Sequence, residues 1–392
     1  MRAFVCLLLV AGCNSNAAPP PGHSPPTPTP VPSAVSDAQV ATPVPVDANP
    51  GTLAGKEMYQ ALCSPCHGKD MKGYAADNAP SLITQTFLES ATDEFLVRSI
   101  TTGRPGTSMA AYGKGLGGPL DDAAIKRLVG YLREQGPAPM TLPLVGAGDP
   151  KQGEPLYVKH CATCHGDKTT RRENIHLANM MFQAQAQDPF IKYAIVNGRP
   201  GTKMAAFGAI GAVLTDKQID HVVAYVRSLG ASSSKVEPKI AQLPAPTGKE
   251  PLVINPKGKD PAWKLREDRF VSVDDAAKAL KAGAKMIIID ARPPSEWMQS
   301  HLKGAVSIPY HDMKRLDELP KNVWAIAYCA CPHHLSGIVI DELKKRGYTK
   351  VAVLDEGIND WHRKGYPMTV AEGVKPPVAE DHSGHDHSGH GH

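Results

Sequence analysis

Two copies of a C-x-x-C-H pentapeptide, at residues 63–67 and 161–165, are the part of this sequence best equipped for chemistry. Two thiols at this spacing can add to the vinyl groups of one haem, and the adjacent histidine can place an imidazole nitrogen on the iron. Two C-x-x-C zinc or redox motifs, each followed by a histidine by chance, would give the same letters. The residues predicted to attach haem are Cys63, Cys66, Cys161 and Cys164.

A second repeated phrase favours the haem interpretation over the zinc or redox one. The sequence G-R-P-G-T-x-M follows each pentapeptide and ends at Met109 and at Met204. A methionine presented by a loop rich in proline and glycine is the usual sixth ligand of such a haem, and its thioether raises the reduction potential of the iron. The expected axial pairs are therefore His67 with Met109, and His165 with Met204.

The repeat extends beyond these two motifs. A glycine and a tyrosine precede both pentapeptides at matching spacings, and an amphipathic helix is predicted to close each unit, over residues 121–136 and 215–230. Two all-α units are therefore expected, at residues 51–137 and 147–231. They resemble class I cytochrome c domains, and their tandem order resembles dihaem cytochromes of the c4 type. The resemblance implies two covalently bound haem c groups and a role in electron transfer.

A linker at residues 232–265 leads into a segment of different composition. The short apolar run at residues 286–290 is typical of a buried parallel strand, and similar runs alternate with helical segments after it. This alternation predicts an α/β domain with a parallel sheet over residues 266–370. Further strands are expected at 306–309, 323–329 and 351–354, with one helix reaching Leu280 and another at 336–346.

The α/β segment resembles the rhodanese family of sulfurtransferases. Asp290 and Arg292 match the D-x-R of that family and are expected to support its site, and Gly357 and Trp361 open its closing G-x-x-x-W-x-x-x-G-x-P pattern. The fold class predicted for the whole chain is multidomain. Two all-α cytochrome c domains are followed by one α/β rhodanese-like domain.

Cys329 ends a predicted strand and opens the loop before the next helix. Backbone N–H groups of such a loop stabilise an anion, so the pKa of the thiol is expected to fall. The thiolate would attack a sulfane sulfur and hold it as a persulfide, whereas a buried structural cysteine is the alternative. Cys331, His333 and His334 stand where the family commonly has Arg and Gly, and we expect them to modulate the site. The two histidines would bind an anionic substrate less strongly than Arg. Cys331 would resolve the persulfide, pair with Cys329, or form a soft metal site with the two histidines.

The two ends of the chain carry signals of their own. Residues 1–12 read as a lipoprotein signal peptide, after which acylated Cys13 would hold the protein on the periplasmic side of a bacterial membrane. An ordinary secretory signal with an incidental cysteine is the alternative. Residues 13–50 read as a Pro-rich disordered tether, and the tail at 371–392 as a natural metal-binding segment or an affinity tag. The tail histidines expected to bind a transition metal weakly are His382, His385, His387, His390 and His392.

A formal net charge of +4 and the absence of a basic run give no support for a nucleic-acid partner. The segments together predict a dihaem electron-transfer protein that handles sulfur at Cys329, in periplasmic sulfur metabolism or respiratory electron transfer. One alternative is a sulfur oxidoreductase or thiosulfate-type sulfurtransferase with the haems as electron exit. The other is a noncatalytic docking or sensing module on an electron carrier. Expected partners are another cytochrome or a terminal oxidase, and a donor of sulfane sulfur.

Overall fold

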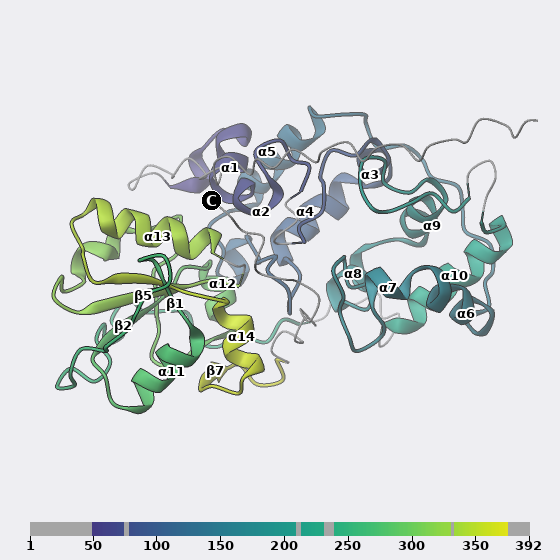
Figure 1. Cartoon of the computed structure of the whole chain (residues 1–392). Helices are drawn as coiled ribbons and strands as arrows, with labels where there is room; N and C mark the ends of the chain where they lie inside the picture. Colours follow the sequence, from purple (N-terminus) through teal and green to yellow (C-terminus); the bar gives the residue numbers. More distant parts are fainter. Residues whose placement is uncertain (1–48, 74–77, 209–212, 231–238, 331–332, 375–392) are drawn as a thin grey trace, which may run out of the picture. The chain divides into compact units, whose positions relative to one another are not determined.

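The computed structural model describes residues 49–73, 78–208, 213–230, 239–330 and 333–374 (Figure 1). The predicted lipidation site Cys13, the loop cysteine Cys331 and the histidine tail lie outside these residues. Within the described ranges, no helix combines the length and the apolar character needed to cross a bilayer.

Two helical units with the same order of elements form the first half of the described chain. The first contains short 3₁₀ turns at Pro50–Thr52 and Lys114–Leu116 and the helices α1 (Gly55–Leu62), α2 (Ser64–His67), α3 (Gln85–Ser90), α4 (Asp93–Thr102) and α5 (Asp122–Arg133). The second contains α6 (Pro150–His160), α7 (Ala162–His165), α8 (Met180–Gln185), α9 (Asp188–Asn197) and α10 (Asp216–Leu229).

The closing helices α5 and α10 lie within the segments predicted from periodicity. Asp121 caps α5 by accepting a hydrogen bond from the backbone N–H of Ala124 at 2.9 Å, and Thr215 caps α10 in a capping box. Both helices bury the stripe of apolar residues that predicted them, so packing of one face supplies most of their stability. The buried residues of this stripe in α5 are Ile125, Leu128, Val129 and Leu132.

The repeated glycine before each pentapeptide marks a close crossing of two helices. A Cβ at Gly55 would lie 2.7 Å from the carbonyl oxygen of Arg127 on α5, and a Cβ at Gly153 would lie 2.0 Å from that of His221 on α10. No real Cβ approaches a backbone atom so closely, so only glycine allows the first and last helices of each unit to meet. Their contact positions the C-x-x-C-H segment, which follows the first helix directly.

The C-terminal part is an α/β domain. Its main sheet has the parallel strand order β1-β6-β5-β2-β4, and β3 pairs with β7 in a separate antiparallel pair. The strands are β1 (Phe270–Val271), β2 (Met286–Asp290), β3 (Ser300–Leu302), β4 (Val306–Ser307), β5 (Trp324–Tyr328), β6 (Val351–Leu354) and β7 (Met368–Val370). The helices are α11 (Val273–Lys281), α12 (Pro294–Trp297), α13 (His334–Lys345) and α14 (Gly357–Arg363), with a 3₁₀ turn at Lys314–Glu318.

The central strand β2 is buried on both faces. Ile287 and Ile289 pack in the cluster that contains α13, whereas Ile288 packs on the other face with residues of α11 and α14 (Figure 1). A strand covered on both sides needs an uninterrupted apolar run, which is the pattern that predicted it. β4 is shorter than the predicted 306–309 and ends before Pro309, a residue without an N–H to donate to a ladder.

Candidate haem and sulfur sites

The two pentapeptides adopt the same local structure. Each histidine ends a single helical turn, and its Nδ1 lies within hydrogen-bond distance of a backbone carbonyl: 3.0 Å from Pro80 for His67 and 2.8 Å from Ile175 for His165. A carbonyl oxygen can only accept, so Nδ1 carries the proton and Nε2 bears the lone pair that a metal requires. The structure therefore gives both histidines the tautomer of a metal ligand.

The G-R-P-G-T-x-M loops are also built twice with the same hydrogen bonds. In the first loop the N–H of Arg104 donates to the carbonyl of Met109 at 2.8 Å, and the hydroxyl of Thr107 accepts from the N–H of Met109 at 3.1 Å. The second loop repeats both bonds at 2.9 and 3.1 Å. Gly103 opens the first loop with φ of +60°, where a Cβ would lie 2.4 Å from the carbonyl oxygen of Met109. These bonds fix the backbone that carries each methionine.

Two arginines of these loops test whether the residues fit haem. Arg104 donates to the carbonyl of Gly103, the side-chain carbonyl of Gln185 and the hydroxyl of Ser99, which are all neutral oxygens. Arg199 donates to the carbonyl of Thr86 and the hydroxyl of Ser90, which are neutral as well. Burial lowers the pKa of each arginine to about 10.

A buried cation surrounded by neutral oxygens is stabilised by an added anion, and haem carries two propionate carboxylates. The cysteine spacing, the histidine tautomers and the two arginines therefore fit haem c. Cys63, Cys66 and His67 would hold the group in the first unit, and Cys161, Cys164 and His165 in the second. Haem c bound in this way supplies one-electron transfer.

Replacing Met109 with histidine should lower the reduction potential of one haem by on the order of 0.1 V or more, because an imidazole replaces the thioether. Spectroelectrochemical titration of the full-length protein measures both potentials. Met140→His changes a methionine that is 47% exposed and should leave both unchanged. An unaltered potential and spectrum in Met109→His would reject Met109 as a ligand.

Cys329 directly follows β5 and is only 1% exposed. Its Sγ lies 3.3 Å from the Oγ of Ser336 in the first turn of α13, so the thiol faces the start of that helix as the sequence indicated. Cys329 therefore has the position expected of a nucleophile at the carboxyl end of a parallel strand.

The D-x-R residues stand at the end of β2, beside β5. Arg292 donates to both oxygens of Asp290, at 2.9 and 2.7 Å, and to Glu296 at 3.1 Å. The hydroxyl of Tyr328, the residue before Cys329, donates to Asp290 at 2.7 Å. Burial alone would lower the pKa of Arg292, but the charges of Asp290 and Glu296 outweigh burial and raise it. The network thus fixes the strand end that carries Cys329.

The surroundings of the two loop histidines, His333 and His334, differ from those expected of a simple anion-binding site. The Nε2 of His333 lies 2.7 Å from a carboxylate oxygen of Asp355, and its ring packs on Phe270. His334 is the first residue of α13. Burial would raise the pKa of Asp355, but His333 and Arg266 outweigh this effect and lower it. A carboxylate therefore already accompanies His333, and the role of both histidines as modulators stays a prediction.

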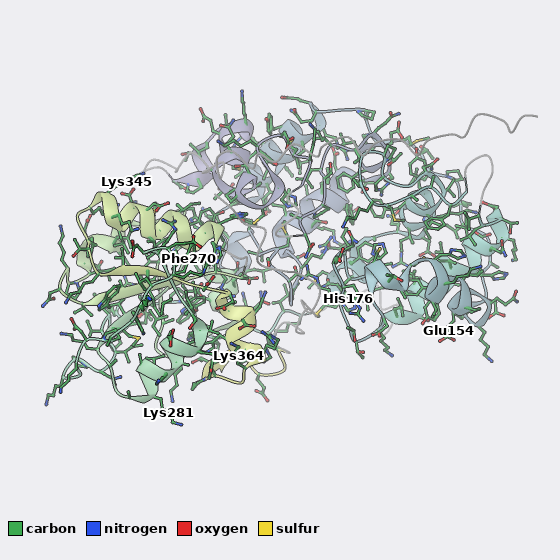
Figure 2. All side chains as sticks on the ribbon, in the orientation of Figure 1. Glu154, His176, Phe270, Lys281, Lys345 and Lys364 are labelled. Atoms are coloured by element: carbon green, nitrogen blue, oxygen red, sulfur yellow. The ribbon has the colours of Figure 1, made fainter. Side chains whose placement is uncertain are left out.

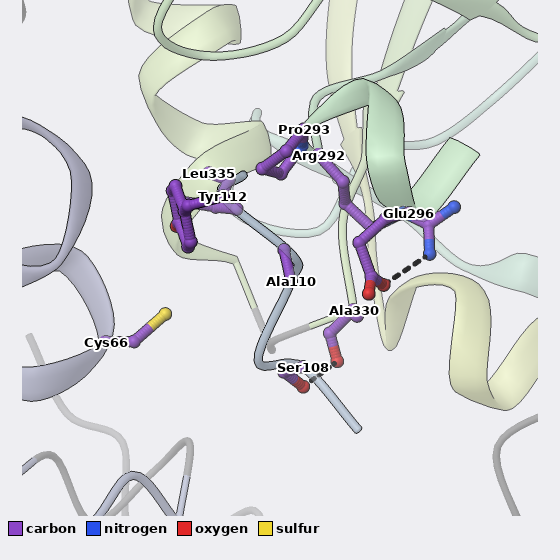
Figure 3. A pocket seen from close by; sticks show the side chains of 9 residues that line it. All are labelled: Cys66, Ser108, Ala110, Tyr112, Arg292, Pro293, Glu296, Ala330 and Leu335. Carbon is purple, nitrogen blue, oxygen red and sulfur yellow. Dashed lines mark hydrogen bonds and ion pairs between the residues drawn. The ribbon is translucent and has the colours of Figure 1, made fainter. Parts of the chain in front are cut away.

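The loop of Cys329 contacts the first helical unit, which no sequence signal indicated. The hydroxyl of Ser108 donates to the carbonyl of Ala330 at 3.4 Å, and that of Ser295 donates to the carbonyl of Ala111 at 2.6 Å. A small pocket lies between these segments (Figure 3), and Cys66 and Ala330 both line it. The first pentapeptide and the loop of Cys329 are therefore neighbours.

Two tyrosines strengthen the same contact. Tyr112 of the first unit and Tyr310 of the α/β domain both donate to the carbonyl of Leu62, at 3.0 and 2.8 Å, and their hydroxyls lie 3.2 Å apart. Leu62 directly precedes Cys63. Both tyrosines are almost fully buried, and they belong to a hydrophobic cluster that runs from the first unit into the α/β domain. This packing fixes the α/β domain against the start of the first pentapeptide.

Two protein families match separate parts of the chain. Residues 51–132 and 148–226 match the family described as cytochrome c oxidase, cbb3-type, subunit III, and residues 272–364 match the rhodanese-like domain. In the cytochrome part the chain is 29% identical over 197 residues to the cbb3-type cytochrome c oxidase subunit FixP of Azorhizobium caulinodans. That match covers 47% of this chain and 64% of the relative. The chain thus spans just under two thirds of that relative's length.

The α/β domain has relatives of its own. A sulfurtransferase of Allochromatium vinosum is 30% identical over 97 residues, a match that covers 22% of this chain and 82% of the relative. A solved rhodanese-like domain from Anabaena sp. is 23% identical, with a TM-score of 0.26, and the match covers 30% of this chain and 89% of that one.

Proposed function

We propose that this chain, which joins two cytochrome c domains to one rhodanese-like domain, is a dihaem electron carrier that takes up sulfane sulfur at Cys329. The observation that carries the proposal is the contact between the loop of Cys329 and the first cytochrome domain. Ser108, one residue before the proposed ligand Met109, is hydrogen bonded to Ala330, one residue after Cys329. This contact supports a function that combines sulfur handling with electron transfer in one protein.

The sulfur step needs no electron carrier. The Cys329 thiolate attacks the outer sulfur of a persulfide or thiosulfate, a new S–S bond forms at Sγ, and the old bond to that sulfur breaks. The donor leaves as a thiolate or as sulfite, so atoms and charge balance without net oxidation. Ser336, 3.3 Å from Sγ, is placed to hydrogen bond the thiolate and orient it.

A sulfur oxidoreductase is the second candidate, and the domain contact favours it over a noncatalytic docking module. Joining sulfide to the Cys329 thiolate would form one S–S bond and release one proton and two electrons. Two one-electron carriers on the same chain match that number. Held by His67 with Met109 and by His165 with Met204, the two haems would supply electron transfer and would leave bond formation to Cys329.

The setting of the protein is proposed by analogy with its relatives and from the sequence ends. We place the haem domains on the periplasmic side of a bacterial membrane, held by acylated Cys13, with a terminal oxidase or another cytochrome as the redox partner. A persulfide or thiosulfate would supply the sulfur. Weak transition-metal binding is assigned to the five histidines of the tail.

Persulfide formation on the full-length protein tests the sulfur role. After treatment with glutathione persulfide under anaerobic conditions, we expect one added sulfur on the peptide that contains Cys329, detected by mass spectrometry. Cys329→Ser should abolish this addition, whereas Cys331→Ser should retain it, because Cys329 directly follows a strand and faces α13. Addition that survives Cys329→Ser but disappears with Cys331→Ser would reverse the assignment. A protein that takes up no sulfur at either residue would leave the domain as a docking module.

A further inference from the structure

The two cytochrome domains present the same face to different surroundings. In the first domain the three residues after Met109 are Ala110, Ala111 and Tyr112, which are 3%, 2% and 9% exposed. The matching alanines of the second domain, Ala205 and Ala206, are exposed. The two domains are copies of one unit in the same chain. A difference in the exposure of matching residues therefore shows that different segments cover the two copies.

The pentapeptides show the same asymmetry. Pro65 is buried and Cys66 is half-buried in the first copy, whereas the matching Thr163 and Cys164 are exposed in the second. The first copy is covered because α13 of the rhodanese-like domain contacts α2. In the part of the chain that the structure describes, the face of the second copy remains open to solvent.

The open face combines apolar side chains with basic ones. Ile175, whose carbonyl accepts from His165, is 41% exposed, and Lys203, directly before Met204, has a side chain that is 83% exposed. Lys203 pairs with Glu173 at 3.4 Å, which joins the methionine loop to the loop of Ile175. Figure 2 shows His176 on that second loop, where its Nε2 lies 2.8 Å from the carbonyl of Asp167. Exposed apolar groups within a polar rim are typical of a protein–protein interface.

Charge distinguishes this face from the covered one. Residues 158–176 and 198–207 contain six basic and two acidic residues. The matching segments of the first domain, 60–78 and 103–112, contain three basic and two acidic residues. A surface with this excess of positive charge attracts a partner that carries carboxylates.

We propose that the open face of the second cytochrome domain is the docking surface for an acidic one-electron carrier protein. The rhodanese-like domain occupies the equivalent face of the first domain, so an external partner is left with the second. This assignment rests on the proposed electron-carrier role but not on sulfur chemistry at Cys329. A Cys329→Ser protein should therefore bind the carrier as the unmodified protein does, which separates failure of one proposal from failure of the other.

Binding of plastocyanin, an acidic blue copper protein, to the full-length haem-loaded protein tests the surface. The Kd is measured by isothermal titration at low and at high ionic strength. Replacing Lys168 and Lys203 with glutamate should weaken binding at low salt by roughly tenfold or more, and the difference should shrink as salt screens the charges. The control replaces Lys126 and Lys281 with glutamate, which changes the net charge equally on other exposed surfaces. This control should change the Kd less than about twofold.

A second readout does not depend on redox activity. Acetylation of lysines, read by mass spectrometry, should label Lys203 in the free protein, and plastocyanin should protect Lys203 while Lys126 continues to react. Equal weakening by the control pair, no binding at low salt, or protection elsewhere would overturn the proposal. Lys203 that stays unlabelled without plastocyanin would show that another segment of this chain already covers the face, which would overturn it as well.

Discussion

Replacing Cys63 and Cys66 with alanine should reduce covalently bound haem from two groups per chain to one. The thioether bonds require both thiols at this spacing, and the second pentapeptide keeps its own pair. The mass of the denatured protein and its haem absorbance per chain measure the loss. A mass that does not change would show that the first pentapeptide carries no haem, and the proposal of two haems would be wrong.

The same pair of substitutions in the second domain separates the effect of losing a haem from an effect on the rhodanese-like domain. Cys161→Ala with Cys164→Ala should also leave one haem per chain. Only Cys63→Ala with Cys66→Ala, however, should disturb the rhodanese-like domain. Leu62, directly before Cys63, accepts the hydrogen bonds of Tyr112 and Tyr310 that hold that domain. Faster alkylation of Cys329 is therefore expected after the change in the first domain alone. Equal alkylation rates of Cys329 in the two variants would contradict the inference that the contact at Leu62 holds the rhodanese-like domain in place.

Replacing Arg292 with alanine should lower the free energy of unfolding of the rhodanese-like domain by about 3–5 kcal/mol, because Asp290 and Glu296 would remain as buried carboxylates without their cation. Arg292 is 4% exposed and Asp290 is fully buried. Three of the four tryptophans of the chain lie in this domain, and the fourth, Trp263, packs against its core, so denaturant titration followed by tryptophan fluorescence measures its stability. Lys345→Ala removes one side of a surface ion pair and should cost less than about 1 kcal/mol.

The loss caused by Arg292→Ala should depend on pH. Burial raises the pKa of Glu296 even beside the guanidinium, and without Arg292 this pKa rises further. A carboxyl whose folded pKa is raised destabilises the fold above its unfolded pKa, and the penalty disappears as pH falls below that value. The difference between variant and unmodified protein should therefore be larger at pH 7 than near pH 4. A constant difference would show that packing, and not charge, is what Arg292 contributes.

Local patterns in the sequence were enough to predict the elements that hold the sites. The apolar stripe of α5 and the uninterrupted run of β2 each follow from how one segment buries its own side chains, and both predictions are confirmed. Strand and helix ends were less accurate. The helix predicted from Ser336 begins two residues earlier, at His334, because the N–H of Gly337 donates to the carbonyl of His333 at 2.7 Å and so closes a helical turn before Ser336.

The contact between the first cytochrome domain and the rhodanese-like domain could not be predicted. Tyr112 and Tyr310 are separated by almost two hundred residues, and each alone reads as an ordinary core aromatic. The same holds for Ser108 and Ser295, whose hydroxyls donate to backbone carbonyls across the contact. Every residue has a backbone carbonyl, so the sequence does not indicate which one accepts. Periodicity reports which face of a segment is buried, but it does not report which distant segment covers it.

Anaerobic reduction of the haems by a sulfur donor tests the central claim most directly. The oxidised full-length protein is mixed with sulfide, because joining sulfide to the Cys329 thiolate releases two electrons whereas transfer of sulfur from a persulfide releases none. The absorbance bands of reduced haem c are followed in parallel with the Cys329→Ser variant. If sulfur held at Cys329 is coupled to the cytochrome domains through the contact at Ala330, the unmodified protein should be reduced and the variant should not. Equal rates of reduction in the two proteins would contradict the claim, because electrons would then reach the haems without Cys329.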